Sequence, residues 1–261
     1  MEEQSVKQCC ATFYGSDFAR MLLGDSFHPG GTKLTQRLGE LLALKSESHV
    51  LDVASGRGTS GFHLAQSFGC KVTGVDLSDE NVRQSAAEAL QRGVVERVSF
   101  QLGDAERLPF GDETFDAIVC ECAFCTFPSK LIAAHEFYRV LKPGGQLGLS
   151  DLTRAEAALP GLEGLLSWIA CIANALPAER YVAILQQAGF QVMRTEDHSD
   201  ALVDMVQQIQ AKLLGAEIMA GLKKIDLPGV DFATGRQFAQ AALQATRKGT
   251  LGYAVIPARK P

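Results

Sequence analysis

The stretch from His49 to Gly61 constrains the fold of this chain more than any other. An apolar strand pattern around Asp52 leads into a glycine-rich turn that contains Gly56 and Gly58, and a helix pattern begins directly after the turn. The backbone N–H groups of such a turn and the positive end of the following helix face the same small volume. That volume suits the carboxylate or phosphate of a cofactor.

The glycine spacing by itself leaves two classes of enzyme open. The pattern Gly56-x-Gly58-x-x-Gly61, with Asp76 closing the next strand, also fits the dinucleotide-binding fingerprint. It therefore does not separate a nucleotide-dependent oxidoreductase from a methyltransferase. The segments that follow along the chain make that separation.

Apolar strand patterns alternate with helix patterns through the first 151 residues. Strands are predicted near residue 50 and at 72–76, 98–102, 115–121 and 146–151, with a Lys142-Pro143-Gly144-Gly145 turn before the last of these. This alternation is typical of a doubly wound parallel α/β sheet. Right-handed crossovers place the loops after the strands at one edge, where ligands bind.

The rest of the chain is predicted to complete and decorate this sheet. Helices are expected at 161–175 and 178–188, then a strand at 190–196, helices at 200–222 and 232–248, and a last strand at 251–257. We therefore expect a seven-stranded sheet with a reversed last strand and a helical insertion at about 200–248. Before the sheet, residues 1–45 are predicted to form a helical lid, including a helix at 32–44 capped by Thr32, and residues 46–261 form the main domain.

Composition excludes several classes of function. The net charge of −5 and the absence of a basic cluster with interleaved aromatics argue against nucleic-acid binding, and no apolar run is long enough to span a membrane. The first residues do not form a leader pattern, and seven cysteines, an odd number, suggest reduced thiols. We expect a soluble cytoplasmic protein that acts on a small molecule.

The ordered set of motifs over residues 48–151 resembles the class I S-adenosylmethionine (SAM) methyltransferases. The resemblance is carried by Asp52 before the glycine loop, Asp76 after the second strand, the Gly103-Asp104-Ala105 segment and the Lys142–Gly145 turn. It implies a Rossmann-like class I methyltransferase fold and SAM as the cofactor. The cofactor-binding residues that it implies are Asp52, Ala54, Gly56, Gly58, Asp76, Leu77, Asp104, Ala105 and Glu121.

The resemblance also implies individual roles. Asp76 binds the ribose hydroxyls, and Asp104 with the backbone of Ala105 contacts adenine, unless Asp104 only stabilises its turn. Asp52 orients the loop and accepts from the cofactor's amino group, with a helix cap as the alternative. Ala54 stands where the family loop has its first glycine, and its methyl group is tolerated if φ is negative.

Cysteines rather than histidines mark the expected acceptor side. Cys122 follows the fourth strand, Cys171 lies beyond the fifth, and Cys9 and Cys10 are adjacent in the predicted lid. Each of these, taken alone, reads as a small buried apolar residue. Together they place thiols on three elements that border one cavity.

At these cysteines the chain resembles the arsenite methyltransferases. The Cys9-Cys10 pair, Cys122 and Cys171 match that family, whereas its Tyr-Gly-Cys-Gly segment and its cysteine-rich C-terminal part have no counterpart here. The resemblance implies methyl transfer to a trivalent metalloid held by these thiolates, or delivered as a thiol conjugate. Trivalent arsenic takes thiolate ligands and needs no general base. The alternatives are methylation of carbon, oxygen or nitrogen of a small organic acceptor, or a non-catalytic metalloid-binding protein.

Overall fold

A computed structural model gives the fold over residues 20–21, 24, 26–156, 159–163, 171–222 and 231–261. One mixed sheet runs in the order β3-β2-β1-β4-β5-β8-β6, and β7 also pairs with β8. The strands are β1 (His49–Val53), β2 (Lys71–Asp76), β3 (Val98–Leu102), β4 (Phe115–Glu121), β5 (Leu141–Arg154), β6 (Gln191–Val192), β7 (Glu196–Asp197) and β8 (Leu251–Arg259). The first five are parallel, and β8 is antiparallel to β5, as the sequence predicted.

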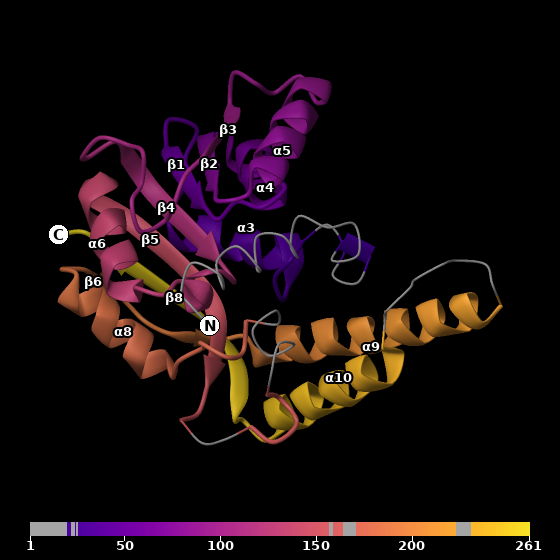
Figure 1. Cartoon of the computed structure of the whole chain (residues 1–261). Helices are drawn as coiled ribbons and strands as arrows, with labels where there is room; N and C mark the ends of the chain where they lie inside the picture. Colours follow the sequence, from indigo (N-terminus) through magenta and orange to yellow (C-terminus); the bar gives the residue numbers. More distant parts are fainter. Residues whose placement is uncertain (1–19, 22–23, 25, 157–158, 164–170, 223–230) are drawn as a thin grey trace.

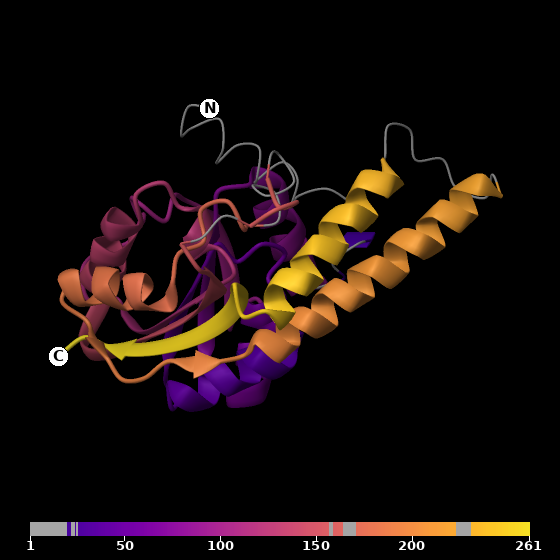
Figure 2. The ribbon, with the colours of Figure 1, turned by 90° about the horizontal axis from the view of Figure 1, so that it is seen from below.

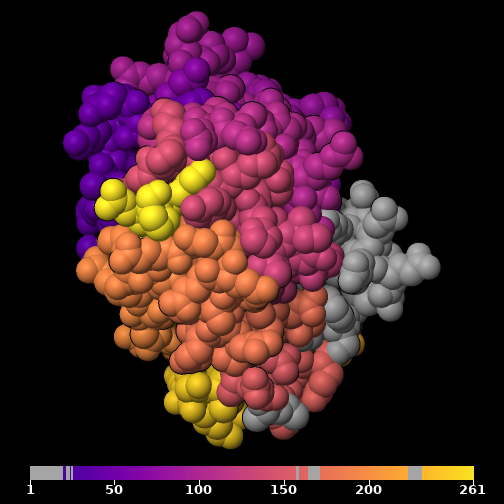
Figure 3. Space-filling view, turned by 90° about the vertical axis from the view of Figure 1, so that its left-hand side faces the viewer, coloured from indigo at the N-terminus to yellow at the C-terminus, as the bar shows by residue number. Residues whose placement is uncertain are grey.

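Helices cover both faces of the sheet (Figure 1). They are α3 (Gly31–Leu41), α4 (Thr59–Phe68), α5 (Asp79–Gln91), α6 (Lys130–Val140), α8 (Ala178–Gln187), α9 (Ser199–Gly221) and α10 (Phe232–Arg247). Helix α3 packs against α4 on one side, and α6 packs against α8 on the other. Figure 3 views the molecule from the side of α8, whose orange surface adjoins the yellow C-terminal residues. None of the described helices is both long and apolar enough to cross a bilayer.

Burial on both faces explains why the sequences of the central strands are almost entirely apolar. Val50, Leu51 and Val53 of β1 are at most 1% exposed, because helices cover both faces of the sheet. The residues of β4 from Ala117 to Cys120 are at most 2% exposed. Polar side chains occur mainly where these strands end, and this pattern places the candidate site at their carboxyl edge.

Helices α9 and α10 form an antiparallel pair that projects beyond the sheet (Figures 1 and 2). They occupy the segments that the sequence predicted as a helical insertion, and α10 begins with the Asp231 carboxylate accepting the Thr234 N–H at 3.0 Å. Whether this pair and the first 45 residues act as an insertion and a lid stays a proposal. Residues 1–19, which include Cys9 and Cys10, lie outside the described part of the chain.

Two predicted elements differ in detail near the last strand. The strand expected at 190–196 is divided into β6 and β7, which pair with β8 on either side of a gap. Pro257 of β8 faces this gap and has no N–H to donate, so the ladder is interrupted there, although the Met193 N–H still reaches the Pro257 carbonyl at 3.0 Å.

Other local predictions were wrong. Thr32 does not cap α3, because Gly30 occupies the N-cap position with a φ of 78°. The described parts of 161–175 are not helical, and Gly161 and Cys171 both have positive φ there. The Lys142–Gly145 segment belongs to β5, where the pairing with β4 shifts register.

Candidate cofactor and acceptor site

The ends of the parallel strands β1, β2 and β4 meet at one cavity. Strand pairing brings Val53 beside Val75 and Cys120, so the residues that follow each strand lie next to one another. The cavity is lined by most of the residues predicted from the sequence, namely Asp52, Ala54, Gly56, Asp76, Leu77, Asp104, Ala105, Glu121 and Cys122. Gly58 and Cys171 do not line it, and Cys9 and Cys10 are outside the described residues.

The glycine loop adopts a conformation that ordinary residues rarely hold. Ala54, Gly56 and Gly58 have φ values of 56°, 54° and 81°. The condition given for tolerating the Ala54 methyl group, a negative φ, is therefore not met, and this residue holds a left-handed conformation that is costly for a side chain with Cβ. A Cβ at Gly58 would lie 2.3 Å from the Phe100 ring, so this glycine is required by packing and torsion rather than by contact with a ligand.

Two carboxylates at the floor of the cavity each have an oxygen without a partner. Asp52 Oδ2 and Glu121 Oε1 are buried and accept no hydrogen bond from any described residue. Burial raises the pKa of Asp52 well above its ordinary value, and the neighbouring Glu121 and Asp76 carboxylates raise it further. Buried carboxylate oxygens of this kind call for a cationic partner. The ammonium group of the methionyl part of SAM supplies one, so the cavity fits this cofactor.

The other oxygen of Glu121 is held firmly from three sides. Glu121 Oε2 accepts hydrogen bonds from Ser60 Oγ at 2.6 Å and Thr35 Oγ1 at 2.9 Å, and His28 Nε2 lies 3.6 Å away. His28 is itself only 7% exposed and lines the same cavity. These contacts come from α3, α4 and the turn before α3, so they fix the direction of the free oxygen into the cavity.

The alternative considered for Asp52, a cap on the following helix, stays open. The backbone of Gly61, in the first turn of α4, lowers the pKa of Asp52 against the effect of burial. This position is compatible with facing the cofactor, since one carboxylate oxygen has no partner among the described residues.

Asp76 lies at the end of β2, where its carboxylate organises the loop. Oδ2 accepts the Gly56 N–H at 2.8 Å, and Oδ1 accepts the Ser78 N–H at 2.8 Å and the Asn81 Nδ2 at 3.2 Å. Asp76 is 8% exposed. The residue predicted to bind ribose thus also holds the glycine loop against the second strand.

We expect Asp76→Ala to weaken SAM binding by about 1.5 to 3 kcal/mol, because a charged acceptor for two hydroxyls and an anchor of the loop are both lost. Isothermal calorimetry measures this change. Asp79→Ala, in the exposed first turn of α5, is the matched control and should leave the affinity unchanged. Unaltered SAM affinity in Asp76→Ala would contradict the assignment.

The turn after β3 brings Asp104 and Ala105 to the same cavity. Asp104 Oδ1 accepts the Glu106 N–H at 2.9 Å, and the Arg107 N–H donates to the Asp104 carbonyl at 2.9 Å. Asp104 therefore stabilises its turn, as the alternative interpretation held. Its position in the cavity wall keeps the adenine contact as a proposal.

Cys122 and Cys171, predicted together from the sequence, are in contact. Cys171 Sγ lies 3.8 Å from the Cys122 carbonyl oxygen, and a hydrogen bond between the two thiols raises the pKa of Cys122, with burial adding to the effect. Both residues have positive φ, 53° and 62°. Left-handed backbone at residues with Cβ concentrates at functional sites, and here it places two thiols together.

Cys125 and Asp151 extend this thiol cluster and were missed from the sequence. Burial and a hydrogen bond with Cys171 raise the pKa of Cys125. Asp151 Oδ2 accepts the Cys125 N–H at 2.8 Å, Oδ1 accepts the Leu152 N–H at 2.7 Å, and burial raises the pKa of Asp151 to about 7. Asp151 lies within β5 and closes the strand predicted at 146–151, which was the available signal.

The thiol cluster does not by itself form a metal site. Within the described ranges no group of three or more histidine, cysteine, aspartate or glutamate side chains is placed to hold a metal ion. No disulfide joins the described cysteines. Cys70 and Cys120 are fully buried.

Comparisons with known proteins agree with this geometry. A family model described as a methyltransferase domain matches residues 50–145. A Haemophilus influenzae protein described as uncharacterized is 32% identical over 189 residues, which cover 69% of this chain and 73% of that protein. The 27-O-demethylrifamycin SV methyltransferase of Amycolatopsis mediterranei is 27% identical over 262 residues and 94% of each chain.

The same architecture occurs in a solved enzyme that is named for a different activity. The crystal structure of the [4+2]-cyclase SpnF superimposes with a TM-score of 0.78 at 25% identity, and the match covers 98% of this chain and 97% of that one.

Proposed function

Because the chain belongs to the class I SAM-dependent methyltransferases, we propose that it methylates a hydroxyl oxygen of a small organic acceptor. The observation that carries this proposal is the acceptor end of the cavity, where Cys122, Ala123 and Phe127 present an apolar surface beside the cofactor contacts. The relative of matching length that methylates a rifamycin compound supports the same class of acceptor.

The residues of the chain bind and orient the cofactor and the acceptor, and this positioning promotes methyl transfer. When bound, SAM supplies a methyl group on a positively charged sulfur. Asp52 and Glu121 would hold the cofactor's ammonium group and Asp76 its ribose, and together these residues would orient the methyl-bearing end of SAM toward the acceptor. An apolar wall would exclude water and let an acceptor oxygen approach in line, and such positioning supplies much of the rate. The new bond from oxygen to the methyl carbon would form as the bond from sulfur to that carbon breaks, S-adenosylhomocysteine would leave, and the hydroxyl proton would pass to a base, for which the His28 imidazole in the cavity wall is available.

A second candidate is the metalloid acceptor predicted from the cysteines. The contact between Cys122 and Cys171 beside the cavity favours it. Two observations favour the organic acceptor over the metalloid acceptor. The pKa of Cys122 is raised, so the thiol resists the deprotonation that soft-ion binding requires, and the described residues, which do not include Cys9 and Cys10, contain no group of three side chains placed to hold a metal ion. Membership of a methyltransferase family does not support a non-catalytic metalloid-binding role.

Labelled SAM distinguishes these acceptors. The protein is incubated with hydroxylated aromatic and macrolactone compounds, and separately with arsenite or methylarsenite plus glutathione, and product methylation is measured. We expect label on an organic hydroxyl and none on arsenic. The result also separates methyl transfer from a cyclase reaction, which would consume no SAM.

Serine variants sharpen the test. Cys122→Ser and Cys171→Ser nearly preserve side-chain volume, so organic methylation should change by less than about threefold. Arsenic-dependent consumption of SAM that disappears in either variant but persists in Cys70→Ser would overturn the organic proposal in favour of the metalloid. Cys70 is the control because it is buried in the separate cluster around β2 and α4.

A further inference from the structure

The turn at 103–110 carries Asp104 and Ala105, and only its first part lines the cavity. Within the turn, the Glu106 N–H donates to the Asp104 side chain and the Arg107 N–H donates to the Asp104 carbonyl. The Gly103 N–H donates to the Asp76 carbonyl at 3.0 Å, which fixes the start of the turn. Its far end needs a separate attachment if Asp104 is to keep one position.

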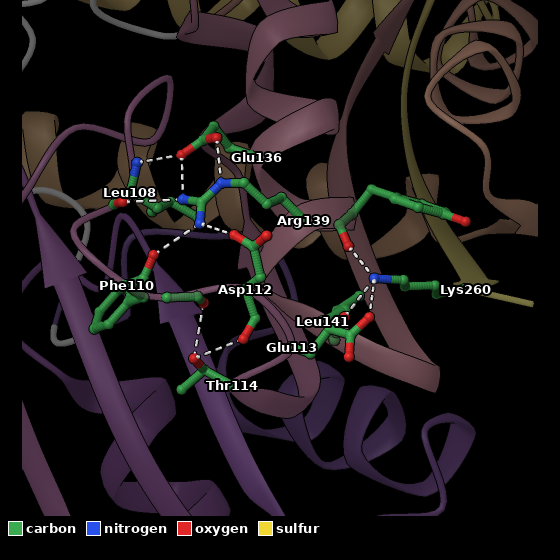
Figure 4. Close-up of polar contacts among 11 residues, drawn as sticks. Leu108, Phe110, Asp112, Glu113, Thr114, Glu136, Arg139, Leu141 and Lys260 are labelled. Carbon is green, nitrogen blue, oxygen red and sulfur yellow. Dashed lines mark hydrogen bonds and ion pairs between the residues drawn. The ribbon is translucent and has the colours of Figure 1, made fainter.

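Arg139 of α6 provides that attachment (Figure 4). Its Nη1 donates to the Phe110 carbonyl at 2.8 Å, and its Nη2 donates to the Leu108 carbonyl at 3.2 Å. Glu136, three residues earlier on the same helix, accepts the Leu108 N–H at 2.8 Å. The backbone of Leu108 is thus held through both its N–H and its carbonyl.

The Arg139 and Glu136 side chains also form an ion pair with each other. Arg139 Nε and Nη2 each lie 2.7 Å from an oxygen of Glu136, and Nη1 lies 2.8 Å from Asp112 Oδ1. The bidentate pair lowers the pKa of Glu136 and keeps it ionised. A planar guanidinium satisfies two carbonyls and two carboxylates at fixed angles, which an ammonium group cannot do.

Ser129 attaches the same turn at the other end of α6. Its N–H donates to Glu106 Oε1 at 2.7 Å, so both ends of this helix hold the turn. The anchors lie behind the cavity, and neither Arg139 nor Glu136 is among the residues that line it.

We propose that Arg139, locked by Glu136, is a positioning residue that sets adenine recognition by holding the Asp104 turn in place. The inference rests on the proposed contact between Asp104 and adenine. It concerns cofactor selectivity only and is independent of which acceptor is methylated. Without the anchor, the turn samples several positions. Binding the cofactor must then order the turn, and the conformational entropy that is lost lowers the affinity for SAM.

The test compares Arg139→Gln and Arg139→Lys with Arg83→Gln. Arg83 is the control because it forms ion pairs within α5 to Asp79 and Glu80 and holds no loop carbonyl. Calorimetry gives the Kd for SAM and for its inosine analogue, in which the 6-amino group is replaced by a carbonyl. Steady-state assays give kcat at saturating SAM.

We expect Arg139→Gln to raise the Kd for SAM about tenfold. The ratio of the Kd for the inosine analogue to the Kd for SAM should fall toward one. Arg139→Lys should recover part of both, and kcat should change little because no reacting atom is touched. Amide exchange at 104–110 should accelerate in both variants. Unchanged affinity and preference in Arg139→Gln, or in Arg139→Lys if the glutamine variant does not fold, would overturn the proposal.

Asp104→Ala separates this inference from the assignment on which it depends. A variant that keeps full preference for SAM over the inosine analogue shows that Asp104 does not read adenine. In that case the positioning role is overturned as well, whereas the methyltransferase activity and the organic acceptor are unaffected.

Discussion

Glu121→Gln is expected to weaken SAM binding by about 2 to 4 kcal/mol, one of the largest effects of a single substitution in this protein. The substitution keeps the shape of the side chain and removes its negative charge. One carboxylate oxygen then no longer faces the cofactor's ammonium group, and Asp52 alone must balance a buried cation. Calorimetry with SAM and with S-adenosylhomocysteine, which carries the same ammonium group, should show similar losses.

The contacts that hold Glu121 offer a matched comparison. Thr35→Val removes one hydrogen bond to Glu121 Oε2 without touching the cavity-facing oxygen. Its effect on SAM affinity should be smaller, about 1 kcal/mol. Equal affinities of wild type and Glu121→Gln would show that the unpartnered oxygen does not meet the cofactor.

Asp151 is expected to make the stability of the apoprotein depend on pH. Its folded pKa of about 7 lies above the ordinary value of 3.8. The folded state therefore binds this proton more tightly than the unfolded state does. The stabilisation is complete below the unfolded pKa and is lost as pH rises through 7. Between pH 5 and pH 8 this group should remove about 2 to 3 kcal/mol from the free energy of unfolding.

Urea denaturation at pH 5 and pH 8 measures the change. Asp151→Asn cannot titrate, so the difference in stability between wild type and this variant should shift by that amount across the range. The variant also loses one of two backbone hydrogen bonds, a cost that should be the same at both pH values. Asp79→Asn serves as an exposed control. Parallel pH profiles for wild type and Asp151→Asn would show that the pKa is not raised.

The sequence determined that the sheet is doubly wound and where its ligand edge lies. Alternating apolar runs and helix patterns specify a doubly wound sheet, because parallel strands buried on both faces leave few alternatives. Strands β2 and β4 end at Asp76 and Glu121, and the resemblance to the class I methyltransferases identified these two residues and Asp52 without coordinates. The reversed last strand was predicted from the strand patterns near the end of the chain, and β8 is buried along almost all of its length.

Only the tertiary structure decided how these side chains are used. The partners of Glu121 come from positions 35 and 60, and those of the Asp104 turn come from α6, so no local pattern could reveal either set. The positive φ values of Ala54, Cys122 and Cys171 depend on contacts that override the intrinsic preference of each residue. A sequence records which groups are available at the ligand edge, whereas burial and long-range hydrogen bonds fix their direction and charge.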